Sequence, residues 1–406
     1  MYDGSGIAPV AEREQPRRVA FTFISRRRWV GGYNYQLNLF AALARHYPGK
    51  IVPVLFAGTG DSEAELAPLS NISGVEVVQS EAFKSFDKRS EGVAATLLTG
   101  IDRSAANAFR ASRIDVVFEV ARFFGWRLPI PVLAWFPDFQ HLRLPGLFSS
   151  VVRWRRDLGF RVQIASRRSI LLSSESALTD FRAEYPGVSN PVAVARFATE
   201  PAADLLTADA AAVIAEHRLP EKFFFLPNQF WRHKNHLLVI EALTILKQRG
   251  VEVVVAATGS TDEPRMSDHF SGLMRGVAER GIEANFCYLG MIPLAHVYAL
   301  LRRSMALINP SRFEGWSTTV EEAKSFGVPM ILSDIPVHRE QAGVGARYFG
   351  VDDARALAEH LAAVSQSPEP SAARNLLPGL DKRVADFAAD FVSAVEKCVD
   401  QFKRRS

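Results

Sequence analysis

Short apolar segments alternate with helical segments along most of this chain, and this alternation constrains the fold more than any other feature. In the first half, apolar segments that predict buried strands lie at 19–25, 51–56, 75–79, 116–120, 132–135 and 170–174. Strands that are apolar throughout and joined by helices form parallel sheets covered on both faces. The sequence therefore predicts an α/β protein, and Ser176 is placed to cap the helix after the sixth strand.

The alternation lapses over the Ala-rich residues 198–220 and then starts again. Further strands are predicted at 223–226, 251–257, 286–289, 306–309 and 330–332. A chain of 406 residues is long enough for two domains of this kind. We expect a disordered lead-in without an export signal, two α/β domains and a terminal helix, at 1–18, 19–200, 201–380 and 381–406 respectively.

The tail carries one apolar stripe at helical spacing. Apolar side chains recur at steps of three and four, at Val384, Phe387, Phe391, Val395, Cys398 and Phe402. Such a stripe predicts an amphipathic helix that packs on another surface. We expect this helix, from Arg383 to Lys403, to cross back to the first domain.

The bulk composition is that of a soluble globular protein. Apolar residues make up 48% of the chain, yet no uninterrupted apolar run approaches the ~20 residues of a membrane-spanning helix. Cys287 and Cys398 stand too far apart in the sequence for a zinc motif and form no disulfide framework. A reducing cytoplasm is the expected compartment.

Positive charge is concentrated in the first half of the chain. Residues 1–200 hold 25 Lys and Arg against 19 Asp and Glu, whereas residues 201–406 hold 23 against 25. The densest run is Arg153 to Arg168. It indicates either a solvated helix face or a peripheral contact with an anionic membrane. Nucleic acid is not expected as a partner, because no binding motif accompanies the charge.

The segment 310–323 carries the strongest chemical signal. A predicted strand runs into a polar turn that holds Glu314, and a helix that holds Glu322 follows. The N-terminus of such a helix binds anions, because its first N–H groups lack intrahelical acceptors. Carboxylates beside an anion site are suited to accept hydrogen bonds from neutral hydroxyls. Phosphate and hydroxyls together indicate a sugar nucleotide.

Four segments of the second half resemble, in order and spacing, the retaining glycosyltransferases of family 4 (glycosyltransferase group 1). They are 227–236, 288–292, 310–323 and 332–340. The first half is similar more weakly, through Gly31, Gly32 and the segment 136–145. The resemblance implies the GT-B fold, with two facing Rossmann-like domains. It also implies transfer of a hexose-type sugar from a nucleotide-diphosphate donor to a hydroxyl acceptor with retention.

The resemblance assigns roles around the two glutamates. Glu314 would contact hydroxyls of the donor sugar, and Glu322 would contact the ribose. The backbone after Glu314 would cradle the diphosphate, through Gly315, Trp316, Ser317, Thr318 and Thr319. Independently, Thr318 to Glu321 has the spacing of a capping box, so we expect Glu321 to serve the helix end.

Basic and backbone groups complete the predicted donor site. Lys234 follows a strand and opens a helix, where a lysine can place its charge on a pyrophosphate. Family members carry an arginine near the position that Asn228 occupies here, and Arg232 is the candidate substitute. The loop with Gly290 and Ile292 would present backbone groups to the nucleobase, which leaves the base unidentified.

In the first domain, the resemblance places three further features at the sugar. Gly31 and Gly32 would allow close approach of the backbone to a ligand. Asp138 keeps the position of the family aspartate, whereas Pro137 stands where the family histidine would be. The sequence leaves open whether Gln140 or His141 takes over that role.

Several properties follow for the reaction. The chain contains no Asp-x-Asp triplet, so we expect neither a metal clamp nor a cofactor beyond the sugar nucleotide. Retention, implied by the resemblance alone, would proceed by a same-face mechanism in which the leaving phosphate helps to deprotonate the acceptor. The acceptor would be a saccharide or a lipid-linked saccharide in cell-surface polysaccharide or lipopolysaccharide synthesis, at the inner face of the cell membrane.

Other functions make different demands on the sequence. A glycoside hydrolase requires two opposed carboxylates, whereas Glu314 and Glu322 share one loop–helix unit. An epimerase requires an acid–base set that the sequence does not show. A non-catalytic sugar-nucleotide-binding protein, or an inactive partner subunit of the same fold, remains open as the alternative.

Overall fold

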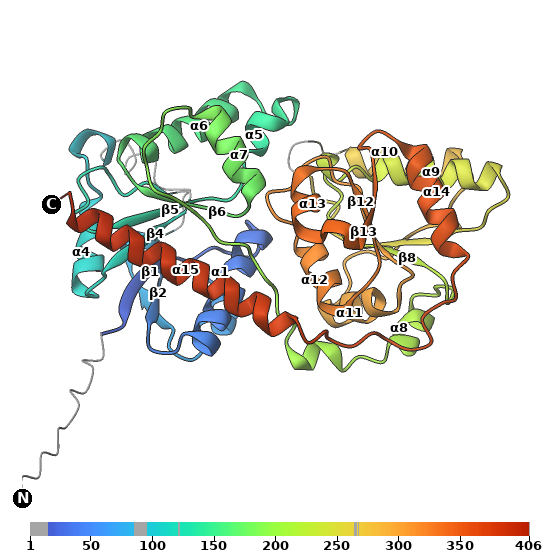
Figure 1. Ribbon diagram of the computed structural model, residues 1–406, viewed down its shortest axis with the longest axis horizontal. Helices are drawn as coiled ribbons and strands as arrows, with labels where there is room; N and C mark the ends of the chain where they lie inside the picture. Colours follow the sequence, from blue (N-terminus) through green and yellow to red (C-terminus); the bar gives the residue numbers. More distant parts are fainter. Residues whose placement is uncertain (1–14, 85–95, 121, 264–265, 267, 406) are drawn as a thin grey trace, which may run out of the picture. The chain divides into compact units, whose positions relative to one another are not determined.

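The computed structural model describes residues 15–84, 96–120, 122–263, 266 and 268–405, and most of the predicted lead-in lies outside them. It contains two parallel sheets (Figure 1). The strand order is β3-β2-β1-β4-β5-β6-β7 in the first sheet and β10-β9-β8-β11-β12-β13 in the second. The predicted α/β class with two parallel sheets is confirmed.

The first sheet uses the six predicted strands and one more. Its strands are β1 (Arg17–Thr22), β2 (Ile51–Ala57), β3 (Glu76–Gln79), β4 (Val116–Glu119), β5 (Val132–Phe136), β6 (Ser169–Leu172) and β7 (Val192–Val194). The α-helices described along this half are α1 (Val30–His46), α2 (Glu63–Ser70), α4 (Arg103–Ala111), α5 (Gln140–Arg143), α6 (Ser150–Ala165) and α7 (Glu175–Glu184). β7 escaped prediction because its three residues are too few for a pattern.

The second sheet begins where the alternation restarts. Its strands are β8 (Phe224–Leu226), β9 (Val255–Ala257), β10 (Phe286–Tyr288), β11 (Leu307–Asn309), β12 (Met330–Ser333) and β13 (Ala346–Phe349). The accompanying α-helices are α8 (Ala210–Glu216), α9 (His236–Gln248), α10 (His269–Glu279), α11 (Leu294–Arg303), α12 (Thr318–Phe326), α13 (Pro336–Ala342) and α14 (Ala354–Ser365). β9 is shorter than predicted, since it begins only at Val255.

The second sheet separates two apolar cores. Successive side chains of a strand point to opposite faces. In β8, Phe224 and Leu226 pack into the core under α9, α10 and α14, whereas Phe225 packs into the core under α8, α11 and α12. Figure 1 shows these two sets of helices on opposite sides of the sheet. The uninterrupted apolar character of the predicted strands is thereby explained.

Aromatic rings fill the cores beside the first sheet. Phe21 of β1 meets Phe40 of α1 with ring centroids 4.8 Å apart. Phe136 of β5 stacks on Phe160 of α6 at 4.1 Å. A side chain of this size contributes about 1.5–3 kcal/mol when it is fully buried. These contacts fix α1 and α6 against their own strands.

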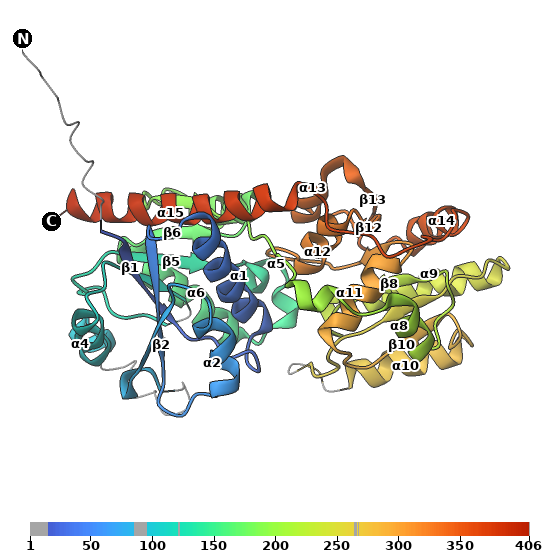
Figure 2. The ribbon, with the colours of Figure 1, turned by 90° about the horizontal axis from the view of Figure 1, so that it is seen from below.

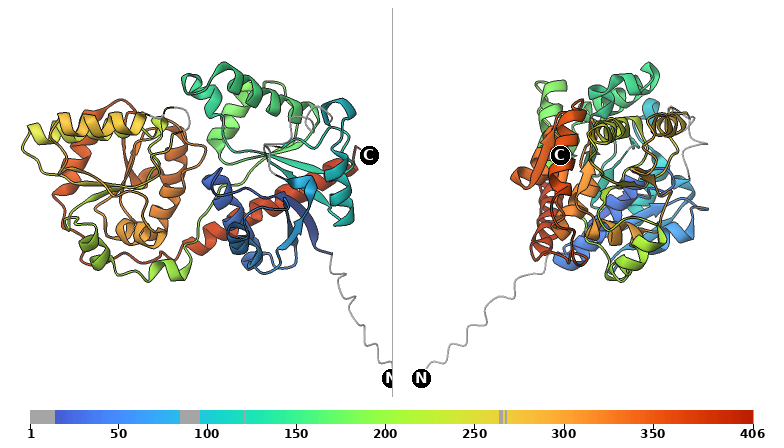
Figure 3. Two further views of the ribbon diagram at one scale, coloured as in Figure 1. Left: turned by 180° about the vertical axis from the view of Figure 1, so that it is seen from behind. Right: turned by 90° about the vertical axis from the view of Figure 1, so that its right-hand side faces the viewer.

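The chain divides into two compact units, residues 1–133 with 395–406 and residues 134–394. The terminal helix α15 (Leu380–Lys403) is one unbroken helix (Figures 2 and 3). Its last part, from Val395, belongs to the unit of residues 1–133, so the predicted return to the first half is confirmed. Within the described residues, no helix has the length and apolar character needed to cross a membrane.

Candidate nucleotide-sugar site

The candidate site lies at the carboxyl ends of the strands of the second sheet. Loops after β8, β10 and β11 contain Lys234, Gly290 and Glu314. The carboxyl ends of parallel strands meet at one edge, where α/β proteins bind their ligands. The structure thus brings together residues that are far apart in the sequence.

Lys234 and Glu314 form a buried ion pair. Lys234 Nζ lies 2.6 Å from Glu314 Oε1, and the two side chains are 15% and 8% exposed. Asn235 adopts a left-handed conformation with φ 58° between the turn that holds Lys234 and the start of α9. Its amide donates to Val351 O at 2.9 Å, which holds the turn in place.

The surroundings of Glu314 favour its ionised form. Burial acts most strongly and opposes ionisation, but Lys234, His233 and a hydrogen bond from Ser311 outweigh it and lower the pKa of Glu314. Ser311 Oγ lies 2.6 Å from Glu314 Oε1. The carboxylate is therefore a fixed acceptor for hydroxyl groups.

Asn309, the last residue of β11, braces both ends of the loop. Its amide nitrogen donates to Ser317 Oγ at 2.9 Å, and its amide oxygen accepts from Ser311 N at 3.2 Å. Asn228, at the end of β8, donates to the same oxygen at 3.3 Å. Both asparagines are buried. Asn228 is thus a neutral brace, and the structure shows no cation at the position of the family arginine.

Two residues of β12 and α13, which no sequence pattern marked as functional, support the loop from behind. Ser333 Oγ donates to Ser311 O at 2.5 Å. His338 Nδ1 lies 3.0 Å from Ser333 O. Burial lowers the pKa of His338, while Glu314 opposes that shift. A neutral His338 can donate from Nδ1 and hold this contact.

The N-terminus of α12 offers amides to an anion. Ser317 is its N-cap, and its side chain accepts from Val320 N. The Ser317 amide itself donates to Gln341 Oε1 at 2.9 Å, so it is already occupied. Within the described part of the chain, the Thr318 and Thr319 amides have no hydrogen-bond partner outside the helix. These two amides are left for a phosphate.

The prediction that Glu321 belongs to a capping box was wrong. The cap lies one residue earlier than expected, at Ser317, so Glu321 falls beyond the box position. Its carboxylate is buried and pairs with Lys324 at 2.9 Å and with Arg383 of α15 at 2.6 Å. Glu321 is a structural ion-pair centre behind the site.

Glu322 projects from the same helix in a different environment. Tyr298 of α11 donates to Glu322 Oε1 at 3.2 Å. Removal from water raises the pKa of Glu322 to about 7, and the tyrosine bond offsets part of that rise. The group therefore titrates near neutrality, unlike Glu314.

The loop after β10 has the backbone freedom expected of a base-recognition loop. Gly290 has φ 76°, a conformation that favours glycine. Its carbonyl accepts from Thr258 Oγ1 at 2.6 Å. Ile292 is half-buried against the core under α11. The loop is thus anchored through Thr258 at the same edge of the sheet.

Asp138 lies beside the Glu314 loop, in the same compact unit. A Cβ added to Gly315 would stand 2.5 Å from Pro137 O and 2.9 Å from the Asp138 Cβ. Asp138 Oδ1 also accepts from Gln140 N at 2.9 Å and from Arg156 at 3.2 Å. Only a glycine at 315 permits this close approach.

Other predicted residues lie apart from the ion pair. Arg232 has an exposed side chain, and its amide donates to Glu263 at 3.2 Å. His141 is fully buried, with its ring edge-on to Phe160, and burial lowers its pKa to about 4. Neither ring nitrogen of His141 bonds to another described residue. As placed, His141 is a core residue.

Gly31 and Gly32 lie in the first turn of α1, which starts at Val30. A Cβ on Gly32 would stand 2.4 Å from the Trp29 ring. The glycine is therefore required by packing against Trp29. A ligand contact at these two residues stays a prediction.

Comparisons with known proteins agree with this geometry. Residues 210–375 match the family model of glycosyl transferases group 1. The O-antigen chain mannosyltransferase RfbU of Salmonella typhimurium is 24% identical over 149 residues. That alignment covers 37% of this chain and 40% of the relative's own length.

Solved structures resemble the whole chain. A glycosyltransferase from Rickettsia africae has a TM-score of 0.64 at 13% identity, over 96% of this chain and 99% of its own. HepE of Anabaena, in complex with UDP and glucose, has a TM-score of 0.63 at 15% identity, over 96% of this chain and 99% of its own. WaaG, a glycosyltransferase involved in lipopolysaccharide biosynthesis, has a TM-score of 0.56 at 14% identity, over 95% of this chain and 99% of its own. These identities establish the fold alone, which is GT-B, and the family match together with the RfbU relative supports a glycosyltransferase of group 1.

Proposed function

We propose that this protein transfers a hexose-type sugar from a nucleotide-diphosphate donor to a hydroxyl acceptor, with retention and without a metal ion or cofactor. The observation that carries the proposal is the buried Lys234–Glu314 pair beside the free amides of α12. This arrangement sets a cation and two N–H donors next to a carboxylate. A diphosphate and a sugar hydroxyl are the groups that such a set can bind together.

The leaving group is stabilised electrostatically. Lys234 and the Thr318 and Thr319 amides receive the charge that develops on the diphosphate as the sugar–phosphate bond breaks. Arg232 is exposed, so it can reach a bound phosphate by rotation of its side chain. Preorganised donors of this kind contribute about 3–4 kcal/mol each to the stability of a transition state.

Glu314 positions the sugar. Its second oxygen accepts from sugar hydroxyls, and its charge balances part of the positive charge on the sugar ring. The bond from C1 to the phosphate oxygen breaks while the bond to the acceptor oxygen forms on the same face. The departing phosphate takes the proton of the acceptor.

Glu322 binds the nucleotide by accepting hydrogen bonds from the hydroxyl groups of the ribose. Tyr298 occupies one side of Oε1 and orients the carboxylate. Asp138, beside Gly315, is the candidate contact to the reacting end of the sugar. His141 would have to leave the core to take part.

The relatives favour a surface-polysaccharide pathway. RfbU acts in O-antigen synthesis by its name, and WaaG is involved in lipopolysaccharide biosynthesis. The HepE complexes show that a protein of this fold binds UDP and glucose. We infer a saccharide or a lipid-linked saccharide as acceptor, at the inner face of the membrane.

The exposed surface of α6 fits a peripheral membrane contact. Val151 and Trp154 are 66% and 64% exposed, and the helical repeat places them on the same side of α6 as the exposed Arg155. Exposed apolar and basic side chains on one helix bind anionic interfaces. Co-sedimentation of the full chain with anionic vesicles, but not with neutral ones, is the expected result.

Donor turnover tests the function. Full-length protein is first screened by thermal shift against nucleoside diphosphates and their sugars, since a ligand of the native state raises its melting temperature. The best donor is then incubated with and without saccharide acceptors, and the release of nucleoside diphosphate is measured. A non-catalytic binder, which the buried Asn228 and His141 favour, would bind the donor but release nothing.

A further inference from the structure

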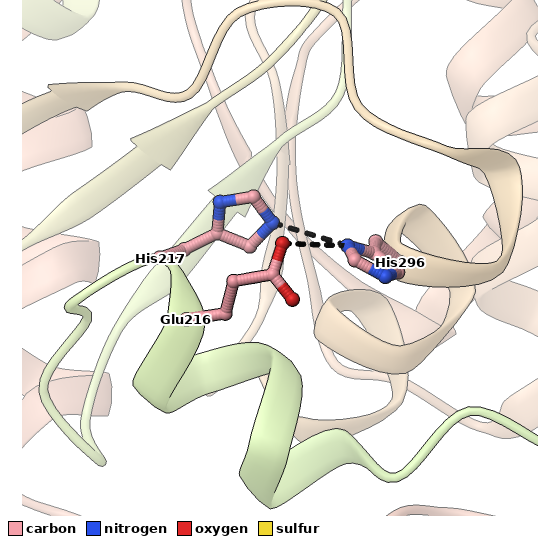
Figure 4. A group of neighbouring side chains, drawn as sticks. All are labelled: Glu216, His217 and His296. Atoms are coloured by element: carbon pink, nitrogen blue, oxygen red, sulfur yellow. Dashed lines mark hydrogen bonds and ion pairs between the residues drawn. The ribbon is translucent and has the colours of Figure 1, made fainter.

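We propose that Glu216, His217 and His296 form a zinc site outside the donor site. Glu216 and His217 lie at the C-terminal end of α8, and His296 lies in the first turn of α11. Figure 4 shows the three side chains pointing toward one another. Their candidate ligand atoms all lie within 4.8 Å of one another. The site goes beyond the proposed transfer reaction, which uses other residues.

The spacing of the nitrogens matches zinc. His217 Nε2 lies 3.3 Å from His296 Nδ1. Zinc–nitrogen bonds of about 2.0–2.1 Å at a tetrahedral angle place two ligands about 3.3–3.4 Å apart. The ring planes are inclined by 78°, so the two imidazoles meet edge to face and are not stacked. The imidazole pair therefore needs little movement to close on the metal.

Glu216 supplies the third ligand. Its Oε1 lies 3.9 Å from His296 Nδ1, and its side chain is 63% exposed and free to adjust. A small rotation brings the carboxylate to the tetrahedral distance. Three protein ligands with a water in the fourth position is a common zinc arrangement.

In the metal-free protein the same 3.3 Å contact is a long hydrogen bond between the imidazoles, beyond the most frequent distance of about 2.9–3.0 Å. The carboxylate beside the pair also provides the negative charge that a bound cation requires. Imidazole ligands favour zinc and its neighbours among the transition metals over magnesium and calcium.

The metal would cross-link two helices. α8 and α11 pack in the same core, which includes Val213 of α8 and Tyr298 of α11. Zinc at their ends would tie the connector before the second sheet to α11. Because Tyr298 contacts Glu322, this cross-link would also steady the candidate ribose carboxylate.

Zinc binding to the full-length, tag-free chain tests the proposal. After removal of metals by a chelator, equilibrium dialysis against zinc chloride should give one zinc per chain. Loss of a residue that only supports a metal ligand weakens zinc binding about 10–100-fold. Loss of a ligand itself should cost at least as much, so His217→Ala and His296→Ala should each weaken zinc binding at least about 10-fold. Glu216→Gln should weaken binding while leaving both histidines in place.

Two control variants separate this site from other zinc ligands. His360→Ala removes a histidine of α14 that bonds to Tyr348 O of β13, and Cys287→Ser removes a partly exposed thiol. Both should bind zinc as the parent does. Cobalt in place of zinc should give the intense visible absorption of tetrahedral coordination, lost in His296→Ala. Unchanged stoichiometry and affinity in His217→Ala and His296→Ala, with metal-free melting temperatures equal to the parent's, would overturn the proposal, as would absence of binding by the parent.

Discussion

Lys234 Nζ and Glu314 Oε1 are 2.6 Å apart, although the two residues come from loops after different strands. Each side chain therefore neutralises the other while no donor is bound. In the proposed reaction, Lys234 would exchange Glu314 for the diphosphate as its anionic partner, so the cation would never face an uncompensated environment. Glu314 would then be free to accept hydrogen bonds from the sugar. Binding of the phosphate would thereby be coupled to binding of the sugar.

Glu314→Gln should lower turnover by at least about 100-fold, the scale of one lost transition-state contact. The substitution keeps the shape of the side chain but removes the charge that faces the sugar. The measurement is the rate of nucleoside diphosphate release at saturating donor and acceptor. Glu359→Gln, in the exposed pair with Arg249, is the matched control and should keep the parent rate. A turnover rate in Glu314→Gln close to that of the parent would contradict the role proposed for Glu314.

Lys234→Ala should also lower turnover at least about 100-fold, and it should destabilise the protein in a pH-dependent way. In the parent, the pKa of Glu314 is lowered, so its contribution to stability is present above the unfolded pKa and is lost as the pH falls through the folded pKa. The variant leaves a buried carboxylate without its partner. The free energy of unfolding measured with urea should be lower in the variant than in the parent at pH 7. This difference should shrink below about pH 4.5. A difference that is constant with pH would contradict this account.

Glu322 should make nucleotide affinity depend on pH near neutrality. Its pKa is raised to about 7, so the folded protein holds a proton that the unfolded chain releases at lower pH. The carboxylate that accepts from the ribose is therefore populated above pH 7. Calorimetric titration with the preferred nucleoside diphosphate should show tighter binding at pH 8 than at pH 6. Glu322→Gln should weaken binding at pH 8 and flatten this difference.

The raised pKa of Glu322 should change the free energy of unfolding in the opposite direction to the lowered pKa of Glu314. A raised carboxyl pKa destabilises the folded state above about pH 7, and the penalty disappears below the unfolded pKa. Glu322→Gln should therefore stabilise the protein more at pH 8 than at pH 4.5, by up to about 3 kcal/mol. Equal unfolding free energies for parent and variant at pH 8 would count against the raised pKa.

Local patterns in the sequence predicted every strand except β7 and β13, and also the helix after Glu314, because each of these depends on residues that are neighbours in the chain. Partners from distant segments could not be read in this way. Glu340 of α13 accepts from the Glu175 and Ser176 amides at 2.9 and 3.0 Å, and the cap of α7 is Ser174 rather than the predicted Ser176. A contact between residues 165 positions apart leaves no local signal.

The candidate site shows the same division. The spacing of Glu314 and Glu322 within one loop–helix unit is local and visible in the sequence. Gln341, which occupies the Ser317 amide, comes from a different helix and carries no motif of its own. The burial of His141 depends on α6, because the ring of Phe160 on that helix packs against the His141 ring. Burial of this kind is decided by packing and not by the polar type of the residue.

Gly315→Ala should impair transfer through geometry alone. The added Cβ would lie 2.5 Å from Pro137 O, a backbone atom that cannot rotate away. The loop must shift, and Glu314 is the preceding residue, so its carboxylate should lose its alignment with Lys234. A misplacement of about 1 Å lowers turnover on the order of 100-fold. Gly272→Ala on α10 has open space around the new Cβ and is the matched control. If Gly315→Ala turned over donor at the rate of Gly272→Ala, with equal melting temperatures, the close approach of the Glu314 loop to Pro137 would have no part in the reaction.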